Sequence, residues 1–173
     1  DKFIYLYDQQ GTVKAEKMIG VMRYAAEVEG VNHFILDSFM KCGIGEDDFN
    51  GQKKFIDNIC TVARDSGMHI HVVCHARKTM NEKAVPGKMD VKGTGAITDQ
   101  VDNVINWWRN KDKENRIRKK IDVEETEPDA MLICDKQRNG EWEGTIGLWF
   151  DPASLQFVQY PNRRAVELID IGF

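Results

Sequence analysis

Two stretches of the sequence decide the fold: His33-Phe-Ile-Leu-Asp37 and His69-Ile-His-Val-Val-Cys-His75. Each is a short run of apolar or bulky residues that ends in a polar side chain, which is the pattern of a buried strand. Between them Phe55, Ile56 and Ile59 recur at helical spacing, and Gly67 ends that pattern. A strand, a helix and a strand in this order predict parallel strands joined by a right-handed crossover.

Two similar patterns precede this unit. Phe3-Ile-Tyr-Leu-Tyr7 is an apolar run that ends at Asp8, and it predicts another strand. A helix is expected next, with Thr12 as its capping residue and Gly30 just after its last turn. Its apolar residues recur at helical spacing: Ala15, Met18, Ile19, Met22, Ala25 and Ala26.

The second half of the chain has a different pattern. An apolar run at 101–108 is followed, after a charged stretch, by strand patterns at 131–136, 144–151 and 155–160. Short turns join the last three, which predicts antiparallel pairing. The expected fold class is therefore α/β, with a mostly parallel sheet flanked by helices and an antiparallel extension at one side.

Composition narrows the class of protein. The 173 residues are 42% hydrophobic and 30% charged, which is typical of a folded domain with a full core. The formal net charge of −4 excludes a uniformly basic nucleic-acid coat but leaves room for a local basic channel. No stretch has the apolar length of a membrane span, and the start is neither a signal peptide nor an initiator Met. The chain is therefore expected to be a piece of a longer protein.

The cysteines favour a reducing compartment. Cys42, Cys60, Cys74 and Cys134 lie far apart and never form a C-x-x-C pair. This spacing argues against a disulfide framework and against a zinc ribbon.

Polar residues follow the predicted strands at Asp8, Asp37 and His75. Ligands of parallel sheets bind beyond the carboxyl ends of the strands, so these side chains mark the expected site. Asp37 can hold Mg²⁺ beside a phosphate, although a simple loop cap is the alternative. His75 can sense a phosphate, whereas a metal site with His69 and His71 is discounted, because mid-strand side chains point into a packed sheet.

The segment from Arg77 to Lys92 is a basic loop, with five basic and two acidic residues. It can grip a nucleic-acid backbone, and a solvated mobile loop is the alternative. Gly93-Thr94-Gly95 follows and offers backbone N–H groups to phosphate.

Residues 109–120 carry seven bases and two acids, whereas 122–129 carry five acids and no base. These two runs are expected to cancel in a solvated hairpin or loop. The sequence has no G-x-x-x-x-G-K-[ST], no G-x-S-x-G and no H-E-x-x-H motif.

Five segments together resemble one family. They are Tyr7-Asp-Gln-Gln-Gly-Thr-Val13, His33-Phe-Ile-Leu-Asp37, Val72-Val-Cys-His75, Asp90-Val-Lys-Gly-Thr-Gly-Ala-Ile97 with Asp102-Asn103, and Lys136-Gln-Arg-Asn-Gly140 followed by Gly144. In this order and spacing they resemble the ring-shaped replicative DNA helicases: bacterial DnaB, phage primase–helicases and mitochondrial Twinkle. The resemblance covers about residues 3–160, and Tyr-Asp-Gln-Gln-Gly is closest to the Twinkle and phage branch.

The resemblance implies a RecA-like motor core that forms a ring, usually a hexamer, and uses ATP and Mg²⁺ to move 5′-to-3′ on single-stranded DNA. Asp37 matches the Walker B carboxylate that supports Mg²⁺, and His75 matches the γ-phosphate sensor. Lys136 and Arg138 match a basic pair that reaches the neighbouring subunit's ATP site, with Arg138 as an arginine finger. Arg109 and Phe150 match the pair that flanks the nucleotide base. The expected DNA contacts are Arg77, Lys78, Lys88, Lys92, Gly93 and Thr94.

The family's phosphate cradle and catalytic glutamate would lie before residue 1. The chain therefore looks like the C-terminal two-thirds of the motor core, at 1–160, with a tail at 161–173, and we expect it to be inactive by itself. Asp99 and Gln100 depart from the family pattern, so neither has an assigned role. The expected partners are single-stranded DNA, further copies of the chain and a primase domain or protein, with no membrane. The expected location is a phage-infected or bacterial cytoplasm, with the mitochondrial matrix as the alternative; the alternative function is a non-catalytic assembly or nucleic-acid-binding domain.

Overall fold

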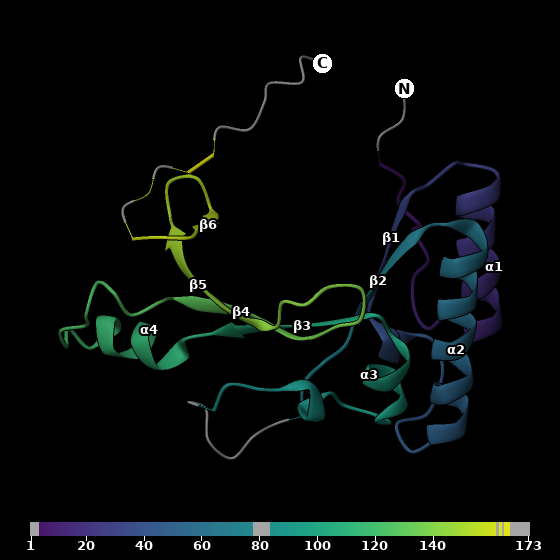
Figure 1. The fold of residues 1–173 in the computed structure, drawn as a ribbon, viewed down its shortest axis with the longest axis horizontal. Helices are drawn as coiled ribbons and strands as arrows, with labels where there is room; N and C mark the ends of the chain where they lie inside the picture. Colours follow the sequence, from purple (N-terminus) through teal and green to yellow (C-terminus); the bar gives the residue numbers. More distant parts are fainter. Residues whose placement is uncertain (1–3, 78–83, 162, 164, 167–173) are drawn as a thin grey trace. The chain divides into compact units, whose positions relative to one another are not determined.

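A computed structural model describes residues 4–77, 84–161, 163, 165 and 166. The chain divides into two compact units. Unit 1 comprises residues 1–77 and 91–101, and unit 2 comprises residues 78–90 and 102–173. Figure 1 labels the helices and strands of both.

Unit 1 is a small parallel sheet with helices on one side (Figure 1). Its elements are α1 (Ala15–Glu27), β1 (His33–Asp37), the 3-10 turn η1 (Phe39–Lys41), α2 (Phe49–Ser66), β2 (His69–Val73) and α3 (Ala96–Gln100). The strands pair in parallel, with His33 opposite His69 and Asp37 opposite Val73. Leu36 of β1 is buried in the same core as Met22 of α1 and Phe55 of α2. The predicted strand–helix–strand unit is therefore confirmed.

Within the described residues of unit 1, the helices cover one face of the sheet. Ile35 is 69% exposed and Val73 is 38% exposed, and both belong to the face that the helices leave uncovered. His69 and His71 lie on that face and are exposed, so the expectation that they point into a packed sheet is wrong. Alternation along the strand places residues of one parity on each face, and only the other parity meets α1 and α2.

Capping residues predict the end of α2 correctly but the start of α1 incorrectly. Gly67 ends α2 with a left-handed φ of 69°, as predicted, and Asp48 caps its start by accepting a hydrogen bond from Gly51 N. The expected Thr12 cap of α1 is wrong, because the N-cap residue is Lys14 and no side chain caps it. Val13 is buried and donates its N–H to Lys41 O, so the chain stays extended up to Lys14.

The predicted strand at the N-terminus is also wrong for the residues described. Residues 4–10 form no strand, and Ile4 and Leu6 are 81% and 89% exposed. An apolar run becomes a strand only where a neighbouring strand accepts its hydrogen bonds. Among the described residues, the sheet of unit 1 consists of β1 and β2 alone.

Unit 2 contains an antiparallel sheet of four strands, in the order β3-β4-β5-β6. The strands are β3 (Asn103–Arg109), β4 (Ala130–Gln137), β5 (Gly144–Asp151) and β6 (Gln156–Val158). The 3-10 turn η2 (Lys88–Asp90) also belongs to this unit. The predicted hairpin after Lys136 and the two following strands are confirmed. The fold class is α/β as expected, although the parallel sheet is small and the antiparallel sheet is separate from it.

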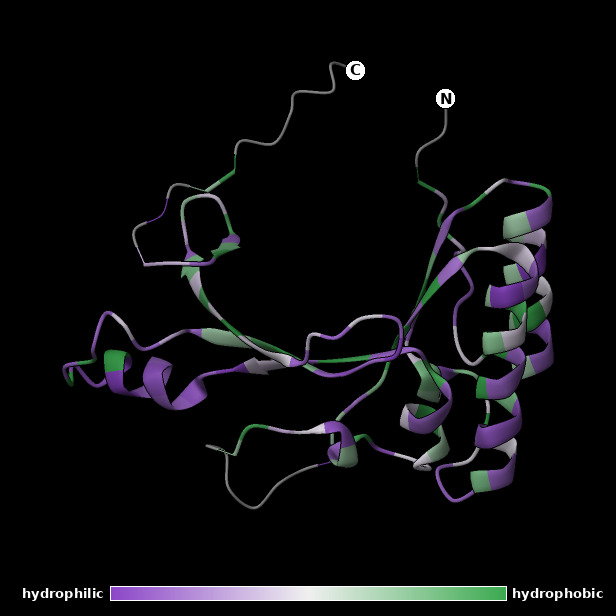
Figure 2. Ribbon diagram, in the orientation of Figure 1, coloured by the Kyte–Doolittle hydropathy of each residue, from purple (hydrophilic) through white to green (hydrophobic). Residues whose placement is uncertain are grey.

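The charged stretch folds as a helix, α4 (Lys111–Arg118), and not as the expected hairpin or loop. Figure 2 shows that α4 is mostly hydrophilic, so no apolar stripe in the sequence reveals it. Asn110 starts the helix, because its side-chain oxygen accepts a hydrogen bond from Lys113 N at 2.9 Å.

The two charged runs meet, as predicted. Lys113 Nζ lies 2.7 Å from Asp129 Oδ1, and Arg116 pairs with Glu127. The hydrogen bond from Arg116 lowers the pKa of Glu127, so this carboxylate stays charged beside the helix. Asn110 also donates to Glu127 Oε1 at 2.9 Å, which fixes the acidic segment against α4.

Among the described residues, no helix has the length and apolar character needed to cross a bilayer.

Replacing Lys113 with Ala tests this account of unit 2. Lys113 is 5% exposed and the Asp129 side chain is 26% exposed, so the variant leaves a poorly solvated carboxylate without its cation. We expect a loss of about 2–3 kcal/mol in the free energy of unfolding, below the cost for a fully buried pair. Urea denaturation measures it. Lys111→Ala, at an exposed position in the same helix, is the control, and an equal small loss in both variants would contradict the account.

Candidate functional site

The carboxyl ends of β1 and β2 bring two predicted site residues to one edge of the sheet. Asp37 is the last residue of β1, and its partner in the register is Val73, two residues before His75. Both Asp37 and His75 are exposed. The strand ends therefore present a carboxylate and an imidazole to solvent at the same edge, where parallel sheets bind ligands.

The segment that contains Lys92, Gly93 and Thr94 is hydrogen-bonded to the backbone of His75. Lys92 N donates to His75 O at 2.8 Å, and Ala76 and Val91 form an antiparallel bridge. The two ends of the basic loop are thus hydrogen-bonded to each other. Lys92, Gly93 and Thr94 lie beside His75 as a result. Lys78 lies outside the described residues.

A buried amide fixes this segment. Gln52 of α2 is 0% exposed, and its Oε1 accepts a hydrogen bond from Thr94 N at 2.9 Å. Its Nε2 donates to the carbonyl oxygens of Gly45 and Glu46, both at 2.9 Å. One side chain therefore ties the loop after β1 to the segment after β2.

Two basic side chains of the segment, Lys92 and Arg77, already have partners in unit 1. Lys92 Nζ lies 2.6 Å from Glu46 Oε1, and Arg77 Nη2 donates to Gly93 O at 3.0 Å. The Lys92 and Glu46 side chains are 41% and 63% exposed, so solvent reaches both charges. This ion pair could not be found from the sequence, because 46 positions separate its members.

Gly93 is required by its backbone geometry. Its φ is +116°, which residues with a side chain rarely adopt. A Cβ there would lie 2.7 Å from Gln52 Oε1 and 3.0 Å from Ile97 Cδ1. The backbone of the segment therefore packs closely on the amide that holds it.

Three imidazoles gather on the uncovered face of the sheet. His33 Nδ1 lies 3.3 Å from His71 Nε2, and the His69 and His71 ring centroids are 4.4 Å apart. Desolvation, with the nearby charges of His69 and His33, lowers the pKa of His71. In the part of the chain that the structure describes, no group of three or more His, Cys, Asp or Glu side chains is arranged to hold a metal ion.

Burial raises the pKa of Cys74 to about 11, so its thiol stays protonated at neutral pH.

The second group of predicted residues belongs to unit 2. Lys136 lies near the end of β4, opposite Val104, and Arg138 is the first residue of the following turn. Arg138 Nη1 lies 3.2 Å from Asp102 Oδ1, and its N–H donates to Asp102 O at 2.8 Å. The Arg138 side chain is 49% exposed. Asp102 thus holds both the backbone and the guanidinium group of Arg138, while solvent still reaches the side chain.

Arg109 and Phe150 lie on one face of the antiparallel sheet. Arg109 pairs with Ala130, Ala130 pairs with Leu148, and Phe150 follows Leu148 by two residues, so the register places them on the same side. Arg109 Nη2 also donates to Glu114 Oε2 at 2.9 Å.

Two aromatic residues that the sequence analysis missed share this face. Phe157 packs on Trp107 edge to face at a centroid distance of 4.8 Å, and on Phe150 at 5.1 Å. Trp107 is 50% exposed and Phe150 is 42% exposed. The sheet therefore presents a partly solvated aromatic surface beside Arg109.

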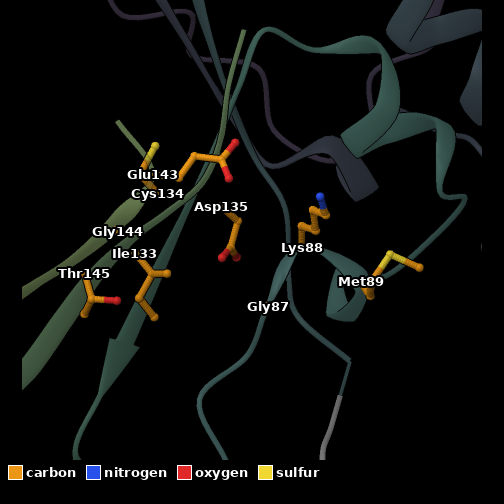
Figure 3. A pocket seen from close by; sticks show the side chains of 9 residues that line it. All are labelled: Gly87, Lys88, Met89, Ile133, Cys134, Asp135, Glu143, Gly144 and Thr145. Carbon is orange, nitrogen blue, oxygen red and sulfur yellow. The ribbon is translucent and has the colours of Figure 1, made fainter. Parts of the chain in front are cut away.

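Unit 2 also contains an open hollow of about 500 Å³ (Figure 3). Lys88 and Met89 lie on one side of it, and Asp135 of β4, Glu143 just before β5 and Thr145 of β5 line it as well. The two carboxylates disfavour phosphate here. Of the predicted site residues that the structure describes, only Lys88 lines this hollow, so it is not where the others meet.

The residue that the sequence analysis missed most clearly is Gln52. It occupies the buried face of α2 with Phe55, Ile56 and Ile59, at spacings of three, four and seven. A polar residue within an apolar helical stripe has to satisfy its hydrogen bonds inside the protein. That exception in the stripe is a signal in the sequence, although its partners are not.

The comparisons with known proteins agree with this architecture. No protein-family model matches the chain, and no curated protein sequence is detectably similar to it. Among solved structures, the chain is similar to a DnaB-like replicative helicase that was described with its interactions with primase. The TM-score is 0.64 at 14% identity, over 88% of this chain and 36% of that protein. The chain thus spans about a third of the length of that helicase and shares its fold over most of its own length.

Proposed function

We propose that this chain is part of the motor of an ATP-driven replicative DNA helicase. One observation carries the proposal: the hydrogen bond from Lys92 N to His75 O, which joins a strand-end histidine to a basic segment. A helicase motor has to link the state of a phosphate to a grip on DNA, and this contact supplies such a link. The fold shared with a DnaB-like replicative helicase supports the proposal.

The proposed nucleotide side is the strand edge with Asp37 and His75. Asp37 is an exposed carboxylate, and no basic side chain among the described residues forms an ion pair with it, which fits a magnesium ligand. Mg²⁺ would supply charge neutralisation to the phosphates of ATP. The His75 imidazole would hydrogen-bond the terminal phosphate, and its carbonyl would pass any displacement to Lys92.

The proposed DNA side is the segment Lys92–Thr94 together with Arg77. The Lys92 ammonium group and the Arg77 guanidinium group suit a phosphodiester chain, and they read no base sequence. The backbone N–H groups of Lys92 and Thr94 are already bonded to His75 O and Gln52 Oε1, so they position the segment and are not part of the proposed contact. Lys78 and Lys88 are proposed as further contacts in the assembled protein. Translocation in the 5′-to-3′ direction is part of this proposal.

The remaining roles depend on a ring, which is proposed to be a hexamer. Lys136 and Arg138 are proposed to reach the ATP bound by the neighbouring subunit, where a guanidinium can bind two phosphate oxygens at once. Arg109 and Phe150 are proposed to flank the nucleotide base, with Trp107 and Phe157 extending the aromatic surface. A primase is the proposed protein partner.

Replacing Lys92 with Ala tests the DNA contact. We expect weaker binding to single-stranded oligonucleotides, by a similar factor for every base sequence, because the lost contact is to phosphate. The slope of log affinity against log salt should fall by about 0.7, the value for one phosphate of a single strand.

Fluorescence anisotropy over a salt series measures both quantities in the 173-residue chain. Lys111→Ala is the matched control, because it removes the same charge from α4, where acidic residues of 122–129 already offset the basic ones. Unchanged affinity and slope in Lys92→Ala would contradict the DNA role.

Replacing Arg138 with Lys in the whole protein tests the subunit boundary. The variant keeps the charge but loses the planar fork, so ATP turnover should fall by up to ~10³-fold while nucleotide binding and ring formation persist. The Arg138→Lys subunits are then mixed with subunits that carry Asp37→Asn. Activity of mixed rings above that of either variant alone is expected if the arginine acts in trans. Normal turnover by Arg138→Lys rings would contradict the assignment.

A further inference from the structure

The proposed DNA-binding lysine already holds an anion. Lys92 Nζ lies 2.6 Å from the Glu46 carboxylate, which is the distance of a charge-assisted hydrogen bond. A phosphate oxygen would approach the same ammonium group in the same way. Glu46 therefore takes one of the three N–H donors of this ammonium group, and its negative charge repels a phosphate that approaches the others.

Hydrogen bonds hold the loop that carries Glu46 in place. The buried Gln52 amide binds the carbonyl oxygens of Gly45 and Glu46 on one side and Thr94 N on the other. Asp48 N also donates to Gly45 O at 3.1 Å, which closes the loop as a turn. The backbone next to Glu46 and the backbone next to Lys92 are thus held by the same buried side chain.

We propose that Glu46 is an internal competitor for DNA at Lys92: opening the ion pair frees a donor of the ammonium group and removes the negative charge that repels a phosphodiester. The inference rests on the proposed function, because it concerns the regulation of the same site. The ion pair also connects the proposed DNA contact with the loop that leads from the proposed nucleotide edge. The loop that carries Glu46 follows β1, the strand that ends in Asp37, so DNA at Lys92 releases a contact of the loop that leads from the nucleotide edge.

The size of the effect follows from exposure. Both side chains are accessible to solvent, so the pair is screened and its strength is that of a surface ion pair. Removing the competitor should therefore raise the affinity for DNA by about twofold to fivefold. A larger number of phosphate contacts elsewhere does not change this factor, because it concerns one lysine.

The experiment compares two variants that each remove one negative charge from the same loop. Glu46→Gln breaks the ion pair, whereas Asp47→Asn, at the adjacent exposed position, leaves it intact. Anisotropy with a labelled oligo-dT strand gives the affinity of the 173-residue chain over a salt series. Glu46→Gln should bind twofold to fivefold more tightly than Asp47→Asn, with a steeper salt slope. The double variant Glu46→Gln/Lys92→Ala should bind no better than Lys92→Ala alone.

The outcomes separate the two proposals. If the chain binds DNA through Lys92 but Glu46→Gln and Asp47→Asn bind equally, the competitor role is overturned and the proposed function stands. If the gain in Glu46→Gln persists when Lys92 is replaced, the carboxylate acts on another group and the inference is also overturned. If no variant binds DNA at any salt concentration, the proposed function fails, and the inference fails with it. Far-ultraviolet circular dichroism checks that the surface variants keep the fold.

Discussion

The side-chain amide of Gln52 is the interaction on which the site of unit 1 depends. It is fully buried and makes hydrogen bonds to Gly45, Glu46 and Thr94, so it uses both its donor and its acceptor capacity. An apolar replacement would remove these three hydrogen bonds to partly buried backbone groups, at a cost of about 0.5–1.5 kcal/mol for each. Two loops that are distant in the sequence are therefore placed by one residue of a helix. The positions of Lys92 beside His75 and of Glu46 beside Lys92 both follow from this contact.

Much of the fold could be predicted from the sequence, because its signals are local. The strands at His33–Asp37 and His69–Val73 and the end of α2 at Gly67 follow from apolar runs and one left-handed glycine. Helix α4 could not be predicted, since a helix without an apolar stripe forms here through the Asn110 cap and the Lys113–Asp129 pair. The apolar run before Asp8 shows the opposite case, where a local pattern for a strand finds no pairing partner among the described residues.

The candidate site, too, could be predicted from the sequence only in part. The carboxyl ends of two parallel strands predict that Asp37 and His75 share an edge, and the structure agrees. The sequence also indicates a basic segment after β2, but it does not show that Lys92 is paired with Glu46. The Lys92–Glu46 contact depends on how the loop after β1 and the segment after β2 both pack on α2, and no local sequence pattern encodes that packing. Lys92 and Arg77 already have partners within unit 1, so the charge of the segment alone overstates how available these two groups are for the proposed DNA contact.

The central claim is that DNA phosphates contact the segment joined to His75. Backbone amide chemical shifts, recorded by nuclear magnetic resonance during titration with a short oligo-dT strand, test this claim directly. The amides of Lys92 and Thr94 are suitable reporters, because one donates to His75 O and the other to Gln52 Oε1. The account predicts that Lys92, Gly93 and Thr94 shift first, together with Glu46 as its ion pair opens. Shifts confined to the basic helix Lys111–Arg118, with Lys92–Thr94 unchanged at saturation, would contradict it.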